Sequence, residues 1–393
     1  MTFLSRLYDR RRSVASVSTV SIFSTALVAF AITYDGKATA DVELNDSGVW
    51  VTRTSGGALG RFNFESQALD GSLLASSASF DVLQNAGKVL LVDDGAGSVS
   101  PVDVARLKLD GTVRPPTGAE VALGGSTVAV LDDEEGLLWV VPFAGVASFD
   151  AENLEPTAEV GGEGVVQVAQ DGTVFVVVPA TGELTKVTTT ATGTVEEVTT
   201  STVPVGKGDE VELTTVGSEP VVLNRTQSQL VLPGGKTLAL EGASDGRLQQ
   251  PGAKTPDVAV ATSTGLVLAP LDGGDAVTRA ASGLPAAPVQ LGGCTYGAWS
   301  QSGQVIRDCA GTDLDIDKRL DGVDPQNRLE YRVNRKAIVL NDLSAGTLWM
   351  AADEYEKVDD WELVLPEQAE GEESEADLST PEQVDQFVLD RSQ

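Results

Sequence analysis

The chain has 393 residues, with 27 Lys and Arg against 58 Asp and Glu, no His, and a formal net charge of −31. This charge argues against nucleic acid as a partner, because phosphate binding draws its affinity from Lys and Arg. The absence of His excludes Ser-His-Asp and Cys-His catalysis within this chain, and it removes the His ligands of a catalytic zinc. Acid–base chemistry would have to come from Asp, Glu, Lys or Tyr.

The first 34 residues carry a membrane signal. Arg6 and Arg10–Arg12 stand before an uncharged, mostly apolar run over residues 13–34. About 20 such residues span a bilayer as a helix, so we expect a transmembrane signal-anchor helix over 13–34. The positive-inside rule then leaves the basic tail 1–12 in the cytoplasm and the bulk of a single-pass protein outside. The alternative is a cleaved signal peptide, with a small-x-small site at Ala29–Ala31.

Residues 35–366 alternate short Val/Leu-rich runs with Gly, Asp, Ser and Pro, a pattern typical of strands and tight turns. A unit of strand, polar turn and strand recurs about eight times at roughly 40-residue spacing. The expected strand pairs are 48–51 with 59–62, 88–92 with 99–104, 127–131 with 137–143, 172–178 with 182–187, 220–223 with 229–232, 265–269 with a continuation around Ala276, 297–300 with 304–307, and 337–340 with 347–350.

A β-strand repeat at this period predicts propeller blades of four strands each. We therefore expect an all-β fold, a seven- or eight-bladed β-propeller over 35–366, preceded by the one transmembrane helix. Asp41–Leu44 could supply the strand that closes the ring. The alternative is a row of β-sandwich domains of about 100 residues each.

Tryptophans occupy four of the expected repeat strands. We expect them to pack between neighbouring blades, and the alternative is that they stack on sugars from an exposed face. These residues are Trp50, Trp139, Trp299 and Trp349. The acidic run Asp132–Glu135 is typical of a charged hairpin turn, with a cation site as the alternative.

Cys294 and Cys309 are the two cysteines of the chain. An even pair in an exported protein predicts one disulfide that closes a short loop. A pair of buried free thiols is the alternative.

Asp313, Asp315 and Asp317 alternate with Leu314 and Ile316, which would place three carboxylates on one side of a strand. Such oxygen-rich spacing makes them a candidate Ca²⁺ site. The alternative is a half-buried strand with a solvated acidic face. No other cofactor is expected.

Residues 367–393 differ from the repeats. The stretch Glu367–Glu375 is acidic and has almost nothing to bury, so we expect a solvated linker. Thr380 as N-cap and Pro381 at the first helical position then predict a short helix over 381–391.

Five stretches carry a resemblance to a known family: Val28–Gly36, Asn45–Thr52, Gly60–Asn63, Phe80–Val82 and Ser98–Val104. Here the chain resembles the N-terminal region of large actinobacterial membrane-anchored surface proteins that carry tandem Ig-like and fibronectin type III modules. The resemblance implies a membrane-anchored propeller followed on the outside by such modules, which residues 1–393 do not contain. It implies no catalytic residue.

These observations favour a binding or scaffold module at the cell surface, with a cell-wall polymer or a surface or membrane protein as partner. It would contact the cytoplasmic membrane through one helix. Two alternatives stay open. One is a carboxylate-based polysaccharide hydrolase or lyase on the propeller scaffold, and the other is a membrane sensor or assembly subunit.

Overall fold

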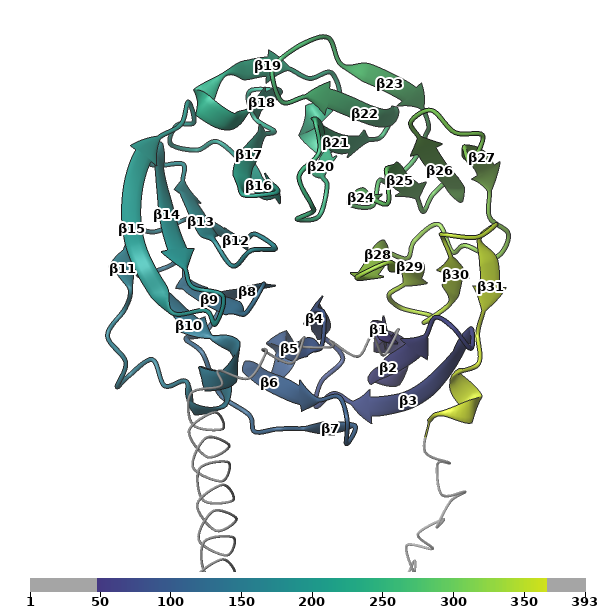
Figure 1. Ribbon diagram of the computed structural model, residues 1–393, viewed down its shortest axis with the longest axis horizontal. Coiled ribbons are helices and arrows are strands. Elements are labelled where there is room, and N and C mark those ends of the chain that lie inside the picture. The colour runs from purple at the N-terminus through teal and green to yellow at the C-terminus, as the bar shows by residue number, and fades with distance from the viewer. Residues whose placement is uncertain (1–47, 366–393) are drawn as a thin grey trace, which may run out of the picture. The chain divides into compact units, whose positions relative to one another are not determined.

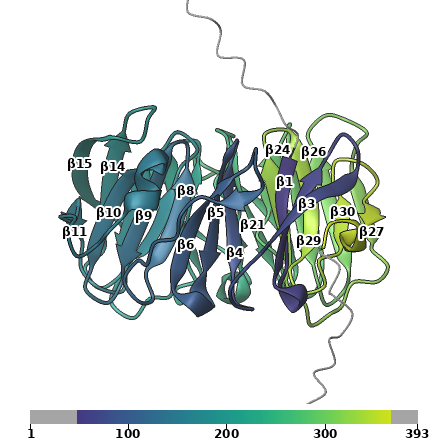
Figure 2. The ribbon, with the colours of Figure 1, turned by 90° about the horizontal axis from the view of Figure 1, so that it is seen from below.

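The structure is a computed structural model, and it describes residues 48–365. These residues form eight antiparallel sheets arranged around a central axis, like the blades of a propeller (Figure 1). The prediction of an all-β propeller is confirmed, the blade number is eight, and the alternative of successive β-sandwiches is wrong. Seen from the side, the strands rise roughly along the axis of the ring (Figure 2).

Each blade is a meander whose strands follow one another outward from the axis (Figure 1). The innermost strands are β4 (Asp81–Asn85), β8 (Glu120–Gly124), β12 (Val165–Val168), β16 (Val211–Val216), β20 (Arg247–Leu248), β24 (Val289–Leu291) and β28 (Leu329–Asn334). The second strands are β1 (Gly48–Arg53), β5 (Lys88–Asp93), β9 (Thr127–Asp132), β13 (Val174–Val178), β17 (Glu219–Asn224), β21 (Asp257–Thr262), β25 (Cys294–Trp299) and β29 (Ala337–Asp342).

The third strands are β2 (Ala58–Asn63), β6 (Ser98–Asp103), β10 (Leu137–Pro142), β14 (Glu183–Thr189), β18 (Gln229–Val231), β22 (Gly265–Pro270), β26 (Gln304–Cys309) and β30 (Leu348–Met350). The outermost strands are β3 (Ala68–Leu74), β7 (Lys108–Leu109), β11 (Ala158–Glu159), β15 (Val195–Thr202), β19 (Thr237–Ala239), β23 (Val277–Ala280), β27 (Ile316–Arg319) and β31 (Glu356–Val358). Six short 3-10 helices complete the fold: η1 (Thr54–Gly56), η2 (Asp94–Ala96), η3 (Phe143–Ser148), η4 (Pro233–Gly235), η5 (Ala243–Asp245) and η6 (Trp361–Leu363).

A buried side chain at the end of the second strand organises the turn to the third strand in several blades. Asp93 accepts the backbone N–H of Ala96, and Asp342 accepts those of Ser344 and Ala345. The turn after Asp342 ends at Gly346 with φ 79°, in the left-handed region that favours glycine. Asp132 accepts two N–H groups in the same way, so the run Asp132–Glu135 is a hairpin turn between β9 and β10.

The core is a ring of apolar clusters, each lying between two neighbouring blades. The four tryptophans named above are all at most 3 % exposed and belong to these clusters. The blades are numbered 1 to 8 in chain order, beginning with the sheet β1–β3. Trp299 of blade 7 donates its indole N–H to the carbonyl of Thr262 in blade 6, at 2.7 Å. The prediction that these residues pack between blades is confirmed.

Blade 8 meets blade 1 at the seam of the ring. Asn341 in β29 accepts the N–H of Thr52 in β1 at 2.8 Å and donates to the Thr52 carbonyl at 3.1 Å. Beyond β31, η6 lies against β3, where Asp360 accepts the N–H of Leu69 and the indole of Trp361 is buried. The C-terminal part of the described chain therefore covers the outer edge of the first blade.

The innermost position of blade 1 holds no strand from residues 48–365, and the expected closing strand Asp41–Leu44 lies outside the described residues. The fourth strand of blade 8 is β31. The expected helices over 13–34 and 381–391, the tail 1–12 and the linker from 367 also lie outside them. Within residues 48–365, no helix is both long and apolar enough to cross a membrane.

Candidate functional site

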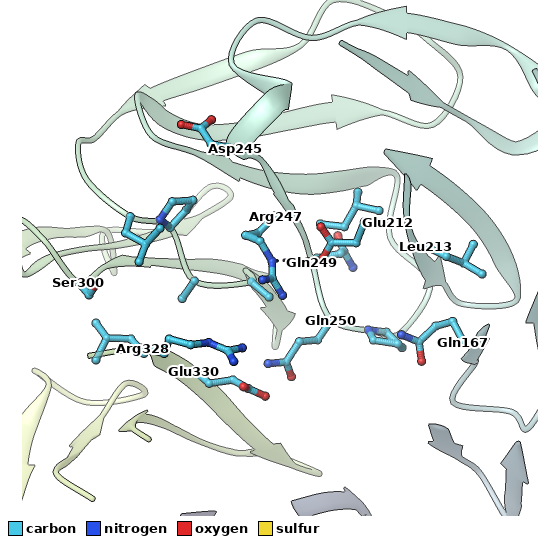
Figure 3. Close-up of a pocket in the computed structure, with 17 residues that line it drawn as sticks. Gln167, Glu212, Leu213, Asp245, Arg247, Gln249, Gln250, Ser300, Arg328 and Glu330 are labelled. Atoms are coloured by element: carbon cyan, nitrogen blue, oxygen red, sulfur yellow. Dashed lines mark ion pairs between the residues drawn. The ribbon is translucent and has the colours of Figure 1, made fainter. Parts of the chain in front are cut away.

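The strongest candidate site lies on the propeller axis, at the end where the inner strands begin. A hollow of about 400 Å³ is present there, and we call it the axial hollow (Figure 3). Its walls come from the starts of β16, β20 and β28, from residues 249–251 after β20, and from residues 284–287 before β24. Because every inner strand runs in the same direction, the residues that open these strands meet at one end of the ring.

Charged residues occupy the first or second position of five inner strands. They are Asp81, Glu120, Glu212, Arg247 and Glu330. A polar opening position is compatible with burial of the rest of the strand, since side chains alternate between its two faces.

Two arginines reach into the axial hollow, where both interact electrostatically with the carboxylate of Glu330. Figure 3 shows the guanidinium groups of Arg247 and Arg328 and the side chains of Gln250 and Glu330 pointing into the same space. Arg247 contacts Glu212 at 3.4 Å, but Glu212 is held more closely by Arg225, at 2.6 Å. Arg328 is exposed and has no ion pair or side-chain hydrogen bond with the residues that the structure describes.

Hydrogen-bonding side chains complete the walls. Gln249 accepts the Ala259 N–H through Oε1, whereas its Nε2 is buried without a partner among residues 48–365. The hydroxyl of Ser300 is buried in the same condition, and both residues line the hollow. Gln250 donates to the Tyr331 carbonyl at 2.8 Å, and this bond links the segment that follows β20 to β28. Buried polar groups without partners are rare in folded proteins and often mark a place for water or a ligand.

A larger hollow of about 970 Å³ continues along the axis toward the ends of the inner strands. Gln167, Gln250 and Glu330 line both hollows. In its wall Arg332 pairs with Glu330 at 2.9 Å and with Asp81. Burial raises the pKa of Glu330, and the neighbouring guanidinium of Arg332 opposes this shift.

Glu120 is the other titratable group of note in the larger hollow. Solvent in the hollow reaches its carboxylate, yet the protein around it raises the pKa of Glu120 to about 7, mainly by desolvation. The N–H of Val166 donates to this carboxylate at 3.2 Å and acts in the opposite direction. A pKa in this range makes Glu120 a candidate proton donor or acceptor near neutral pH.

The predicted disulfide is confirmed. Cys294 and Cys309 are bonded and face each other across the antiparallel pair β25–β26, with their Cα atoms 4.0 Å apart. The bond lies inside one hairpin of blade 7, and Cys294 lines the larger hollow.

The candidate Ca²⁺ residues are not gathered around a common point. Asp315 accepts the Cys309 N–H and faces Arg279 at 3.6 Å, and Asp317 accepts from Gln304 at 2.8 Å. Residues 48–365 contain no group of three or more His, Cys, Asp or Glu side chains placed to hold a metal. The expected single strand over Asp313–Asp317 is also wrong, because β27 begins only at Ile316. The Arg307 guanidinium donates to the carbonyl of Leu314 at 2.7 Å, in the segment that precedes β27.

The arginines of the axial hollow were missed by the sequence analysis. A signal was present, since residues 328–336 hold three arginines and a lysine in a strongly acidic chain. Nothing in the local pattern indicates that Arg328 meets Arg247, which is 81 positions away in another blade.

No protein-family model and no curated protein matches this chain. Among solved structures, dihydro-heme d1 dehydrogenase NirN in complex with DHE is similar over 84% of this chain and 75% of its own, with 13% identity and a TM-score of 0.58. Apo AztD from Citrobacter koseri is similar over 79% of this chain and 93% of its own, with 13% identity and a TM-score of 0.52. BamB from Moraxella catarrhalis is similar over 76% of this chain and 89% of its own, with 14% identity and a TM-score of 0.50. At these identities the likeness extends to the fold alone, and by fold the chain is an eight-bladed β-propeller.

Proposed function

We propose that this chain is a membrane-anchored, extracytoplasmic binding module that holds a polar segment of a cell-wall polymer or of a protein partner in the axial hollow. The observation that carries the proposal is the set of groups in that hollow left without protein partners. Arg328 has no ion pair among the described residues, and two buried polar atoms of residues that line the same hollow, Gln249 Nε2 and Ser300 Oγ, lack hydrogen-bond partners there. A ligand in the hollow that accepts hydrogen bonds would give Arg328 the partner that the described residues do not supply.

The size and position of the hollow support this role. Its volume of about 400 Å³ falls in the range of ligand sites, which usually combine apolar walls with a few placed polar groups. Leu284 and Pro285 supply apolar surface in its wall.

A blocking variant tests the proposal. Ala287 lines the hollow and is half-buried, so Ala287→Phe should fill part of the space. Ala239→Phe on the exposed outer strand β19 adds the same side chain far from the axis and is the matched control. The full-length protein and both variants would be incubated with purified cell-wall fractions and with membrane extracts. We expect the wild type and Ala239→Phe to be retained by one of the fractions and Ala287→Phe to be lost. Equal retention of all three would place binding elsewhere.

The cellular location is part of the same proposal. The arginine-flanked apolar run 13–34 supports a membrane anchor with the propeller outside, and the resemblance to actinobacterial surface proteins agrees with it. Protease treatment of intact cells should remove residues beyond Tyr34. Full protection of those residues, with digestion after cell lysis, would contradict this topology.

A second function is favoured by one observation. Glu120, with a pKa of about 7, and Glu330, with a raised pKa, line the same hollow, and carboxyl groups of this kind can serve as acid or base in glycan cleavage. Release of reducing ends from cell-wall polysaccharide by the wild type, and its loss in Glu120→Gln, would identify a hydrolase. Binding of the polysaccharide without release of reducing ends would contradict the hydrolase function and support the binding module.

A further inference from the structure

The groups that the axial hollow leaves unsatisfied are mainly hydrogen-bond donors. Arg328 has no ion pair within the described chain, and Arg247 pairs with a carboxylate that it shares with Arg225, while Glu330 also acts electrostatically on both. Gln249 Nε2 is also a donor and the Ser300 hydroxyl can donate, although both atoms lie closed to solvent within the wall. Donors of this kind select a ligand that presents acceptor oxygens, and guanidinium groups pair best with a carboxylate or a phosphate.

The carboxylates nearby already have arginine partners of their own. Glu330 is already paired with Arg332 at 2.9 Å, and Glu212 is paired with Arg225 at 2.6 Å. Asp245 is exposed and stands apart from Arg328 and Glu330 in Figure 3. Each of these two arginines also pairs with a second acid, Arg332 with Asp81 and Arg225 with Glu210, so an anion that approaches Arg328 has to displace the influence of Glu330 on its guanidinium.

The charge of the whole chain limits how large that anion can be. A net charge of −31 repels a polyanion such as a polyphosphate or a polyuronate at long range. A single carboxylate inside the hollow carries one charge, and the surrounding salt screens it from the rest of the surface beyond about 10 Å. The site thus favours an isolated carboxylate over a charged polymer backbone.

The remaining walls fit a peptide behind that carboxylate. Gln167 Nε2 can donate to a peptide backbone and Gln250 Oε1 can accept from it, since Gln167 Oε1 already accepts the Val168 N–H and Gln250 Nε2 already donates to Tyr331. Leu213, Leu284 and Pro285 offer apolar surface for small side chains. Capture of a peptide's free carboxyl end is a recognised mode of binding, in which the charged end fixes the register.

We propose that the axial hollow binds the free carboxyl-terminal end of a peptide, with Arg328 as the carboxylate partner and Arg247 as its neighbour. This inference rests on the binding function proposed above and names its ligand class. Two sources can supply such an end: the C-terminus of a protein, and the peptide component of a cell wall, which ends in D-amino acids.

Short labelled peptides test the inference with the full-length protein. Fluorescence anisotropy would compare Ala-Ala-Ala and Lys-D-Ala-D-Ala, each with a free carboxylate and as the C-terminal amide. We expect at least one free acid to bind. Its amide should bind at least about tenfold more weakly, which is the usual effect of losing a charged hydrogen bond. Preference for the L-peptide would indicate a protein terminus, and preference for the D-peptide a wall peptide.

Variants of Arg328 tie the preference to the site. Arg328→Gln should remove the difference in affinity between the free acid and the amide. Arg328→Lys should retain part of it, because lysine keeps the charge but cannot pair with a carboxylate through two parallel N–H groups. Arg319→Gln on the outer strand β27 removes one exposed arginine far from the axis and should leave the preference unchanged. Thermal unfolding of each variant would confirm that it is folded.

The inference is overturned if acids and amides bind equally, if neither binds, or if Arg328→Gln keeps the preference. The binding function can survive that result. If wall or membrane fractions still retain the wild type but not Ala287→Phe, the hollow binds something other than a peptide carboxylate.

Discussion

The side chain of Asn341 completes the ring by pairing with the backbone of Thr52, 289 positions earlier in the chain. Its oxygen accepts the Thr52 N–H at 2.8 Å, its nitrogen donates to the Thr52 carbonyl at 3.1 Å, and the side chain is fully buried. The amide thus takes the place that a neighbouring strand would fill. It links the second strand of blade 8 to the second strand of blade 1.

Replacing this amide should weaken the whole fold. Asn341→Leu leaves the N–H and carbonyl of Thr52 buried without partners, and each such group costs about 1–3 kcal/mol. We expect the free energy of unfolding in urea to fall by roughly 3 kcal/mol. Asn153→Leu is the control, because Asn153 is exposed and bonds only Asp150, so its effect should stay within about 0.5 kcal/mol. Equal effects of the two substitutions would mean that the seam contributes little.

Arg307 joins blade 7 to blade 8 through backbone carbonyls. Its guanidinium is buried and donates to Ala352 at 2.7 Å, to Asp353 at 3.0 Å and to Leu314 at 2.7 Å. Arg307→Met should lower the free energy of unfolding by about 3 kcal/mol, since hydrogen bonds from a charged donor are lost and carbonyls are left short of partners. The free energy of unfolding of Arg307→Lys should lie between those of the wild type and the Met variant, because lysine keeps the charge but lacks the planar guanidinium with its several donors. A Met variant as stable as the wild type would contradict this account.

The disulfide should stabilise the protein without affecting the axial hollow. It closes a loop across 15 positions, which is worth about 3 kcal/mol in the chain-entropy model. The double substitution Cys294→Ala with Cys309→Ala should lower the unfolding midpoint in urea by a corresponding amount. Ligand retention should be unchanged under native conditions, because neither cysteine lines the axial hollow. Cys294 lines only the larger hollow. Loss of retention in a folded double variant would show that the two hollows are coupled.

Glu120 should make stability fall as pH rises. Its pKa is about 7 in the folded chain and 4.5 as an ordinary glutamate, so the folded state binds the additional proton between these values. The stabilising contribution of the protonated form is complete below pH 4.5 and is lost as the pH rises through 7. Urea unfolding at pH 5 and pH 8 should show a smaller decline for Glu120→Gln than for the wild type. Parallel declines in the two proteins would mean that this carboxyl has an ordinary pKa.

The repeat could be predicted because the second and third strands of each blade are buried. Most of the expected strand pairs, such as 88–92 with 99–104, correspond to these two strands, whose apolar runs end at a polar turn. The blade number stayed open between seven and eight because outer strands such as β7 and β11 cover two residues each and leave little pattern.

The candidate site could not be predicted in the same way. Arg247 and Gln249 lie at the start of one blade and Arg328 at the start of another, and only the arrangement of the blades around the axis brings them to one hollow. The expected carboxylate row at Asp313, Asp315 and Asp317 had a clear local spacing. Local spacing was not enough, because Arg279 and Gln304 from neighbouring strands contact two of its members.

Amide hydrogen exchange of the full-length protein, with and without the wall or membrane fraction that retains it, tests the central claim most directly. If the axial hollow is the binding site, the ligand should slow exchange around the starts of β16, β20 and β28 and in residues 284–287, while the outer strands stay unchanged. Protection confined to outer strands such as β15 or β27, with no change around Arg247 and Arg328, would contradict the account.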